Sequence, residues 1–473
     1  TYKLVAYTQW MKNAGISQIF QADIKVINPY NEISNASVSG IDDCGTAESP
    51  ITDIASTRTN SPLVLEMDTT VYNPRSPVQL STRNFKGNLG YGNYSLLVRR
   101  KNELPEPKYI SATDFGYTYL RSAKNIPQQL GDSIYLPEQR GELIFGRVEK
   151  KTTSEPISGQ EVILSLPGEA FQLTATLTNH EGYFYTYIKK PYQADRIIAN
   201  VNEEDDAQVK ILGQSELDFR SLQFCDTRLE RQDSAAVLQR SVHNQLENLF
   251  FSRKPDSVLT TEMPDPFDGG IVDTLRLEDY TRFSTLEETF IELLNYVGFR
   301  RGKDGVEYIR VLQDFEFYDE EYNDYPALVL IDGVFIKDHA FLKKFDAKTV
   351  EEIRILRDQL VLGNNNYQGL IFIKTIDGDF YKQQQAIAHS SNLNSPRWNK
   401  RYFRPDHTYN TWEHIPDYRY VVFWEPDITI NGTREQFNFF TSDIPGDYEA
   451  ILEGFTEYGK PISLSIPFKV VIP

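Results

Sequence analysis

The chain has 473 residues, a formal net charge of −18, 40% hydrophobic residues and 25% charged residues. This composition is typical of a globular protein with several domains and excludes a chain that is disordered throughout. The acidic balance argues against nucleic-acid binding, which needs clustered Lys and Arg, and no apolar run is long enough for a membrane-spanning helix. Abundant Tyr and Phe, 28 of each, predict more strands than helices.

The start of the chain predicts two strands around a turn, at 4–8 and at 19–27. The dipeptide Asn28-Pro29 ends the second strand. Because the chain begins inside a strand, we expect it to be a mature or truncated fragment.

Strand-rich segments recur at 71–80 and 93–99. Together with the opening YKLVAYTQWM, the segments VYNPRSPVQL and GNYSLLVRR resemble strands of macroglobulin-type β-sandwich domains. The resemblance implies that 1–28 are the closing strands of a truncated macroglobulin-like domain and that 29–103 form a second such sandwich. Residues 104–137 carry several prolines and few periodic runs, so we expect a linker there.

A different pattern begins after this linker. The sequence GELIFGRVEKKTTSEPISGQEVILSL, followed by LTNHEGYFYTYI, alternates strands with Gly-containing turns. It resembles the carboxypeptidase regulatory-like (transthyretin-like) domain found in many Bacteroidota receptors, which implies a small sandwich over 138–215. The resemblance implies no peptidase chemistry, and the chain has no zinc-binding HxxE pair.

Two amphipathic helices are predicted from residue spacing. The second begins with a capping box from Ser284 to Glu287 and ends at Gly298. The first begins at Asp233, a candidate N-cap, and places five apolar side chains on one stripe: Leu238, Val242, Leu246, Leu249 and Phe250. Both stripes are expected to pack in the core, because most amphipathic helices bury their own apolar face.

The segment 326–375 carries the most informative pattern of the chain. An apolar run ends at Asp332-Gly333, a tight-turn signal, and a charged segment then leads to the strand EEIRIL. GLIFIKT closes the segment as a further strand. This order resembles the plug domain of TonB-dependent outer-membrane receptors, which the IDGV segment matches closely and the GNNNYQG segment matches loosely.

The resemblance implies a binding site in the turns of this plug-like segment. Its candidate residues are Asp332, Gly333, Val334, Gly363, Asn364, Asn365, Asn366 and Gly369. A plug normally fills a β-barrel of several hundred residues, whereas only about a hundred residues follow Thr375. We therefore expect a plug-like module without a barrel, used for binding and not for transport.

The C-terminal part returns to strands, in four runs between 420 and 472 that are separated by Gly-containing turns. They predict a sandwich over 401–473, and the two helices with the plug-like core are assigned to one α/β domain over 216–400. The order of motifs resembles multidomain Bacteroidota envelope proteins that combine macroglobulin-like domains with a plug lacking its barrel. The predicted fold class is mainly β and multidomain: Ig-like or macroglobulin-type sandwiches, a transthyretin-like sandwich and a small α/β plug-like domain.

The sequence contains no pattern that predicts catalysis. It has no HExxH, GxSxG, P-loop or GxGxxG motif, so we expect neither an enzyme nor a cofactor. No metal site is expected: His407 and His414 lack further zinc ligands, and the acidic run FYDEEYNDY lacks EF-hand spacing for calcium. Cys44 and Cys225 are far apart in sequence and are expected to be two buried thiols.

A short motif recurs more often than the roughly two occurrences that chance would give. Asp followed by Ser or Thr and a small or apolar residue resembles the Bacteroidota O-glycosylation motif. The resemblance implies candidate sites at Thr69, Ser133, Ser257 and Thr274, while the same pattern at Asp233 is assigned to the helix cap. Glycans at these sites would place the protein beyond the inner membrane.

Together these resemblances imply a non-catalytic binding subunit in the periplasm or at the outer membrane. The plug-like module is expected to dock on an outer-membrane β-barrel protein or on a secretion or assembly complex, such as the type IX secretion translocon. The alternative is a surface receptor module that binds glycan or peptide, with a sandwich edge adding a partner strand. A macroglobulin-like protease trap and a hydrolase are less favoured, because neither a thioester motif nor a catalytic set is recognisable.

Overall fold

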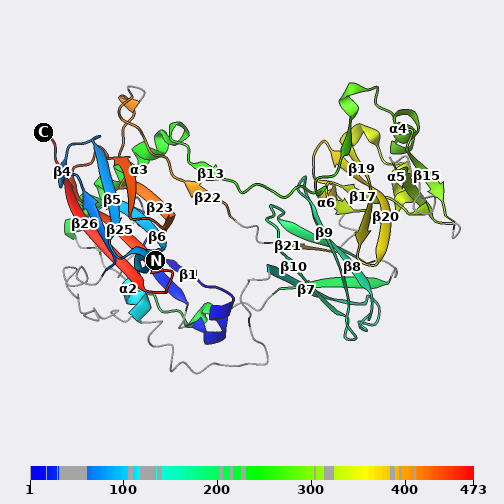
Figure 1. The fold of residues 1–473 in the computed structure, drawn as a ribbon, viewed down its shortest axis with the longest axis horizontal. Coiled ribbons are helices and arrows are strands. Elements are labelled where there is room, and N and C mark those ends of the chain that lie inside the picture. The colour runs from blue at the N-terminus through cyan, green and yellow to red at the C-terminus, as the bar shows by residue number, and fades with distance from the viewer. Residues whose placement is uncertain are drawn as a thin grey trace. The chain divides into compact units, whose positions relative to one another are not determined.

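The computed structural model describes residues 2–16, 19–28, 30, 61–104, 110–117, 135, 141–201, 206–213, 217–224, 229, 231–302, 305–313, 324–383, 389–393, 397–409 and 412–473. The chain divides into two compact units, each built from segments that are far apart in sequence (Figure 1). Unit 1 comprises Thr1–Pro137, Glu216–Leu259 and Asn399–Pro473, and unit 2 comprises Glu138–Ser215 and Thr260–Trp398. The predicted fold class, mainly β and multidomain, is confirmed.

The core of unit 1 lies between a five-stranded and a three-stranded sheet. The five-stranded sheet has the order β23 (Val421–Ile430), β6 (Gly92–Arg100), β25 (Gly446–Thr456), β26 (Pro461–Val470) and β4 (Val71–Tyr72). The three-stranded sheet has the order β24 (Arg434–Phe440), β5 (Pro77–Asn84) and β3 (Leu63–Met67). Alternate side chains from both sheets, such as Leu80, Leu96 and Leu452, are buried in one hydrophobic cluster.

The strand pairing in this sandwich differs from the predicted division into domains. Strand β6 belongs to the predicted 29–103 sandwich, yet it lies between β23 and β25 of the predicted 401–473 sandwich. The C-terminal strands themselves form close to their predicted positions. Alternation shows which residues face a core, but it does not show which distant strands become neighbours.

Smaller elements complete unit 1. Strands β1 (Tyr2–Ala6) and β2 (Phe20–Ile24) form the antiparallel pair predicted from the first residues. Strand β13 (Ser257–Leu259) pairs with β22 (Asn399–Arg401), and a short helix, α2, spans Ala112–Phe115. The predicted linker 104–137 and the cysteines Cys44 and Cys225 lie largely or wholly outside the described residues.

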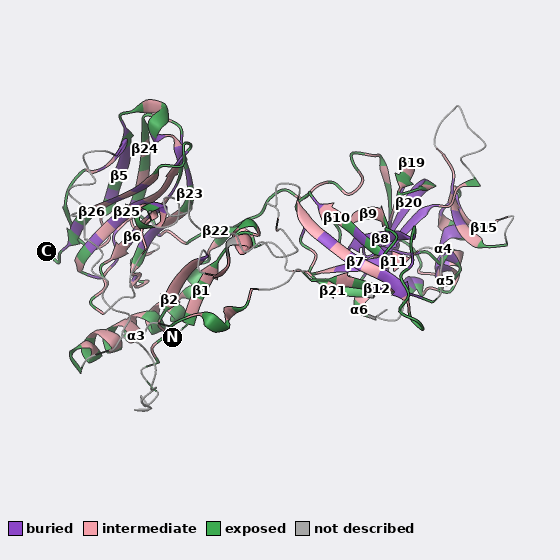
Figure 2. Ribbon diagram, turned by 90° about the horizontal axis from the view of Figure 1, so that it is seen from below, coloured by how far each residue is buried: buried purple, intermediate pink, exposed green. Residues whose placement is uncertain are grey.

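Helix α3 (Ser234–Leu249) forms where it is predicted, but it presents the opposite face to the sandwich. Three of the five stripe residues are exposed to solvent, Leu238 to 61%, Val242 to 46% and Leu249 to 72%, and the other two, Leu246 and Phe250, are half-buried (Figure 2). The expected core packing of this stripe is therefore wrong. The side chain of Asp233 makes no capping hydrogen bond, because that residue already has helical backbone angles.

Unit 2 contains two packed sheets whose strands come from 142–212 and, in the case of β21, from 389–392. One sheet has the order β10 (Tyr183–Ile188), β7 (Glu142–Lys150) and β12 (Ala207–Leu212). The other has the order β21 (His389–Asn392), β11 (Arg196–Val201), β8 (Glu161–Leu166) and β9 (Gln172–Leu177). The two sheets enclose a common hydrophobic cluster that includes Val148, Leu164, Phe184 and Ile197.

The plug-like segment forms most of a mixed sheet in unit 2. The sheet has the order β14 (Val272–Arg276), β19 (Val350–Leu362), β20 (Asn365–Thr375), β17 (Leu328–Ile331) and β18 (Val334–Phe335), and β17 runs parallel to β20. The predicted order of strand, Asp-Gly turn, short helix, strand, turn and strand is confirmed, with α5 (His339–Lys343) as the short helix. A second short helix, α6 (Phe380–Gln383), follows β20.

The second predicted helix is shorter than its spacing indicates. Helix α4 (Leu286–Leu293) has Thr285 as its N-cap in place of Ser284, and Glu288 in place of Glu287 reaches back to the Ser284 backbone. The residues that were expected to end the helix form strand β15 (Val297–Arg301), which pairs with β16 (Glu307–Val311). The residues from Val297 on pair as a strand instead of continuing the helix, because tertiary contacts override the local helical spacing.

Candidate functional site

The predicted site in the plug-like turns is only half buried: Asp332, Gly333, Val334 and Gly369 are buried, whereas Gly363, Asn364 and Asn366 are exposed. Asp332 is 3% exposed and has a φ of 49°. Its carboxylate accepts hydrogen bonds from the Thr375 backbone N–H (2.8 Å), the Thr375 hydroxyl (2.6 Å) and the Phe380 backbone N–H (3.0 Å). These bonds tie β20 and α6 to the Asp-Gly turn, so Asp332 holds the fold together instead of facing a partner.

The other predicted turn residues contact the sandwich of unit 2. Gly333 packs against Gly168, and Val334 is 5% exposed. At the second turn, the carboxylate of Glu161 accepts from the Asn364 backbone N–H (2.8 Å) and from the Asn365 side-chain amide. The remaining three residues divide: Gly363 and Asn366 are exposed, and Gly369 is buried against Val311.

The plug-like sheet and the sandwich of unit 2 therefore share a core. Ile163 and Phe171 from the sandwich belong to one hydrophobic cluster with Leu330, Tyr367 and Phe372 from the mixed sheet. Gly333, Asn364 and Asn365 lie on this shared boundary, where Gly333 packs against the sandwich and the two asparagines are hydrogen-bonded to Glu161.

The remaining sequence candidates lie apart from one another. Thr69, Ser257 and Thr274 are exposed, and Ser133 lies outside the described residues. His414 is exposed, whereas the side chain of His407 is 3% exposed and contacts Asp417. Of the acidic run 317–325, only Asp324 and Tyr325 are described. In the described part of the chain, no three His, Cys, Asp or Glu side chains gather in a way that could hold a metal.

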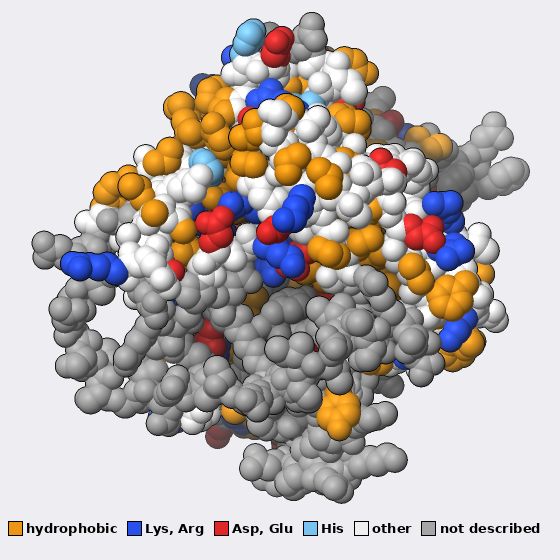
Figure 3. Space-filling model, turned by 90° about the vertical axis from the view of Figure 1, so that its left-hand side faces the viewer, with side chains coloured by type: hydrophobic (Ala, Val, Ile, Leu, Met, Phe, Trp, Pro, Cys, Tyr) orange, Lys and Arg blue, Asp and Glu red, His pale blue; other side chains and the backbone are white. Residues whose placement is uncertain are grey.

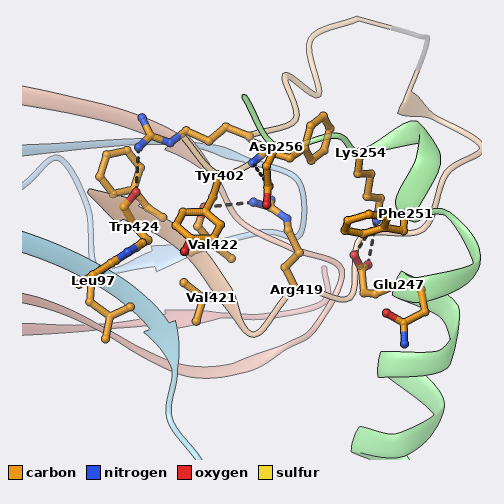
Figure 4. A pocket seen from close by; sticks show the side chains of 14 residues that line it. Leu97, Glu247, Phe251, Lys254, Asp256, Tyr402, Arg419, Val421, Val422 and Trp424 are labelled. Atoms are coloured by element: carbon orange, nitrogen blue, oxygen red, sulfur yellow. Dashed lines mark hydrogen bonds and ion pairs between the residues drawn. The ribbon is translucent and has the colours of Figure 1, made fainter. Parts of the chain in front are cut away.

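A cavity of about 490 Å³ in unit 1 is the strongest candidate site, and the sequence does not single it out. Its walls come from Leu97 of β6, from the end of α3 with the following turn (247–256), from residues 402–404, and from Arg419 with the start of β23 (421–424) (Figure 4). Large apolar side chains dominate these walls, and Phe251, Tyr402 and Val421 are 64%, 45% and 44% exposed at its surface. A volume of this size is typical of a ligand-binding cavity.

The charged side chains in the wall are already engaged with protein groups. Lys254 is 7% exposed; its Nζ lies 2.8 Å from each Glu247 carboxylate oxygen and donates to the Pro416 carbonyl. Glu247 also accepts from the Tyr418 backbone N–H at 2.6 Å. Asp256 accepts from the Phe403 backbone N–H at 3.0 Å. These bonds fix the geometry of the wall.

Strand β23 is an edge strand of its sheet, and two arginines cover its unpaired edge. Arg419 donates to the Val422 carbonyl (3.1 Å), and Arg404 donates to the Trp424 carbonyl (3.0 Å). Pro426 in the same strand has no N–H to offer. These features occupy the backbone groups that a partner strand would need, so the structure disfavours strand addition at this position.

A buried ion-pair network holds Arg419 in this position. Asp417 is 2% exposed and receives both Arg419, at 2.7 and 2.8 Å, and His407, at 3.1 Å. Burial alone would raise the pKa of Asp417, but Arg419 and His407 outweigh it and hold that pKa well below its usual range. Arg419 is thereby kept in place against the cavity wall.

The only sequence signal for this cavity is the density of aromatic residues in the runs RYF and YVVFW. Four segments contribute to the cavity, and about 150 residues separate them at the widest gap, so no local spacing links them. Only the folding of unit 1 brings these segments together.

Comparisons with known proteins do not assign a family. No model of a known protein family matches the chain, and no curated protein matches it. Among solved structures, a tetra-tandem repeat in the extending region of a large adhesion protein aligns at 8% identity and a TM-score of 0.09, covering 87% of this chain and 99% of that one. Salmonella alpha-2-macroglobulin reacted with methylamine aligns at 8% identity and a TM-score of 0.10, covering 87% of this chain and 33% of that one.

Both TM-scores are too low to indicate a shared fold. Among the described residues, no helix combines the length and the apolar character needed to cross a membrane.

Proposed function

We propose that this chain is a non-catalytic binding protein that captures a segment of a partner protein in the cavity of unit 1. The supporting observation is the cavity wall, which is mainly apolar and whose charged side chains are bonded to neighbouring protein groups. An apolar side chain that enters such a cavity leaves water at a gain of about 25 cal/mol per Å² of buried surface.

The partner class in this proposal is an outer-membrane β-barrel protein or a secretion or assembly complex, and the location is the cell envelope. The order of elements in 326–375 supports this choice, because it resembles the order of a plug domain. The residues of the Asp-Gly turn, Asp332, Gly333 and Val334, are buried, so we place the docking head in unit 1 and not in that turn.

The proposal is tested by affinity purification from detergent-solubilised envelope of the native organism. Wild type is compared with Val421→Arg, which places a long charged side chain at the cavity, and with Val361→Arg as a matched control. Val361 is also an exposed strand valine, 71% exposed, but it lies in β19 of unit 2.

We expect a stoichiometric barrel protein or complex with wild type and with Val361→Arg, reduced about tenfold with Val421→Arg. Equal recovery with Val421→Arg would exclude the cavity as the docking site. A wild-type chain that recovers no envelope protein but is retained on a glycan array would support the glycan-receptor alternative instead.

A further inference from the structure

We propose that the cavity of unit 1 takes a lysine side chain of the partner segment, with its ammonium group on Asp256 and its apolar stem against the aromatic wall. This inference rests on the proposed function and deepens it by naming the residue that the cavity recognises.

The first observation is the charge balance of the cavity wall. The other charged side chains of the wall belong to three ion pairs with N–O distances of 2.7 to 2.8 Å: Lys254 with Glu247, Arg404 with Glu425 and Arg419 with Asp417. Asp256 lines the same cavity and forms no ion pair with a Lys, Arg or His side chain of the described residues. The wall therefore carries one uncompensated negative charge, which favours a cationic group in the cavity.

The second observation is the hydrogen bonding of Asp256, which is half-buried. Its Oδ1 accepts from the Phe403 backbone N–H at 3.0 Å, and this bond holds the carboxylate at the wall. No described group donates to its Oδ2. A single open oxygen suits the compact ammonium group of lysine better than the planar guanidinium of arginine, which binds two carboxylate oxygens at once.

The third observation is the aromatic surface around this carboxylate. Four aromatic side chains line the cavity with it: Phe251, Tyr402, Phe403 and Trp424. In the view of Figure 4, Asp256 lies between Tyr402 and Trp424 on one side and Phe251 on the other. A lysine side chain buries its methylene stem against apolar surface and keeps its ammonium at a polar group, and aromatic rings attract that cation as well.

These features also disfavour other occupants. A purely apolar side chain would cover Asp256 and leave its carboxylate with neither water nor a partner, which costs free energy. An acidic side chain would be repelled by Asp256 and by the net charge of −18. The same net charge disfavours a second copy of this chain and attracts a basic segment of another protein.

Many charged side chains of the protein surface lie in mixed groups. Figure 3 shows one face of the molecule, on which basic and acidic side chains lie next to one another. Two exposed pairs of this kind in unit 1 are Arg83 with Glu66 and Lys469 with Asp447. Neighbouring charges of opposite sign offset each other, so such pairs attract a cation less than the unpaired carboxylate of Asp256 does.

The test uses a short peptide with blocked ends, a central lysine and alanine on both sides. Three control peptides carry norleucine, arginine or glutamate in place of the lysine; norleucine keeps an apolar stem but has no charge. Binding to the full chain is followed by NMR of the labelled methyl groups of Leu97, Val421 and Val422, which line the cavity.

The variants separate charge from shape. Asp256→Asn removes the charge and keeps an oxygen that can accept from the Phe403 backbone N–H. Asp427→Asn is the matched control, because Asp427 is an exposed aspartate in β23 of the same unit and does not line the cavity. Tyr402→Leu removes an aromatic ring and keeps an apolar side chain. Thermal unfolding of each variant shows that the fold is retained.

We expect saturable shifts of all three methyl reporters with the lysine peptide, in wild type and equally in Asp427→Asn. The dissociation constant should rise about tenfold in Asp256→Asn and with the norleucine peptide, because the charge-assisted contact is lost. It should rise about threefold in Tyr402→Leu, because a cation–π contact is lost. The arginine peptide should bind more weakly than the lysine peptide, and the glutamate peptide should not bind.

Equal affinity for the lysine and norleucine peptides, or unchanged binding in Asp256→Asn, would overturn the proposal, because the cavity would then take an apolar side chain. Tighter binding of the arginine peptide would overturn the choice of lysine, and the absence of shifts at all three reporters would overturn the site. A dimer in sedimentation that Asp256→Asn dissociates would also overturn it, because the occupant would then be a second copy.

Recovery of the envelope partner separates this inference from the proposed function. If Val421→Arg loses the partner while Asp256→Asn retains it in full, the cavity function stands and the lysine contact is wrong. If the lysine peptide binds as expected but the wild-type chain recovers no envelope protein, the lysine site stands and the proposed partner class is wrong.

Discussion

Gly333 links the Asp-Gly turn to the sandwich of unit 2. It has a φ of 84°, and an added Cβ would lie 2.8 Å from the Gly168 backbone N and 2.9 Å from Phe171 Cβ. The Gly168 N–H donates to the Asp332 carbonyl at 2.8 Å. A side chain at position 333 would therefore face both backbone strain and a direct clash.

We predict that Gly333→Ala destabilises unit 2 more than Gly159→Ala does. Gly159 also has a positive φ, 70°, but nothing lies within 4 Å of its added Cβ. Gly159→Ala should lower the free energy of unfolding by about 1 kcal/mol through strain, and Gly333→Ala by about 3 kcal/mol through strain and clash. Urea unfolding of the two variants measures the difference; equal losses would contradict the close packing at Gly333.

His339 makes the stability of unit 2 depend on pH. Its ring is buried, and Nδ1 accepts from the Ile309 backbone N–H at 2.9 Å. Burial lowers the pKa of His339 from 6.5 to about 4, because a charged ring would be poorly solvated there. The neutral ring is favoured in the folded state, so its contribution is complete above pH 6.5 and is lost as the pH falls from 6.5 to about 4.

We predict that His339→Asn removes this part of the pH dependence while keeping an acceptor oxygen near Ile309. As the pH falls from 6.5 to 4, the free energy of unfolding of wild type should decrease relative to that of the variant by up to about 3 kcal/mol. Denaturant unfolding across that range measures it. A difference that stays constant would show that His339 does not titrate there.

At the scale of elements, α3 is attached to the sandwich through polar and aromatic contacts. His243 stacks on Tyr418 with ring centroids 4.5 Å apart, and its Nδ1 lies 3.1 Å from the Tyr420 hydroxyl. Arg240 lies over the same Tyr420 ring. These contacts replace the hydrophobic packing that the apolar stripe would otherwise provide.

We therefore predict that Leu238→Lys changes the free energy of unfolding of unit 1 by less than about 0.5 kcal/mol, because that side chain is exposed. Arg240→Ala should lower it by about 1 to 2 kcal/mol, because it removes a hydrogen bond and a cation–π contact. If thermal or denaturant unfolding showed a larger loss of stability for Leu238→Lys than for Arg240→Ala, the apolar stripe, and not the polar face, would be the side that packs against the sandwich.

Several elements can be predicted from periodicity, and their limits have identifiable causes. The helical spacing from Leu238 to Leu249 predicts α3 correctly, but it does not show which face turns inward. The cap of α4 is displaced by one residue, because Ser284 and Thr285 are both good caps and only the strand contacts select Thr285. The cavity cannot be predicted, because its walls come from separate segments.

At the scale of the whole molecule, unit 1 is assembled from strands at both ends of the chain. Strand β6 is hydrogen-bonded to β23 on one side and to β25 on the other. Without β6, the buried faces of β23 and β25 would lose their neighbour and their backbone hydrogen bonds. The C-terminal strands therefore depend on residues more than 300 positions earlier.

We predict that a fragment of residues 401–473 does not fold alone, although its strand pattern resembles a complete sandwich. Mixing it with a fragment of residues 61–104, which supplies β3 to β6, should restore strand structure and cooperative unfolding. Circular dichroism and two-dimensional NMR of the separate and mixed fragments measure this. Cooperative unfolding of 401–473 by itself would contradict the prediction.

The sequence by itself determined that this protein is mainly β, where most strands and the two main helices begin, and the order of elements over 326–375. These features depend on local alternation, helical spacing and turn residues, which act between near neighbours. Only the tertiary structure decided that β6 joins the C-terminal strands, that the Asp-Gly turn is buried, that α3 exposes most of its apolar stripe and that four segments form a cavity. Those outcomes depend on contacts between distant residues, which local patterns do not encode.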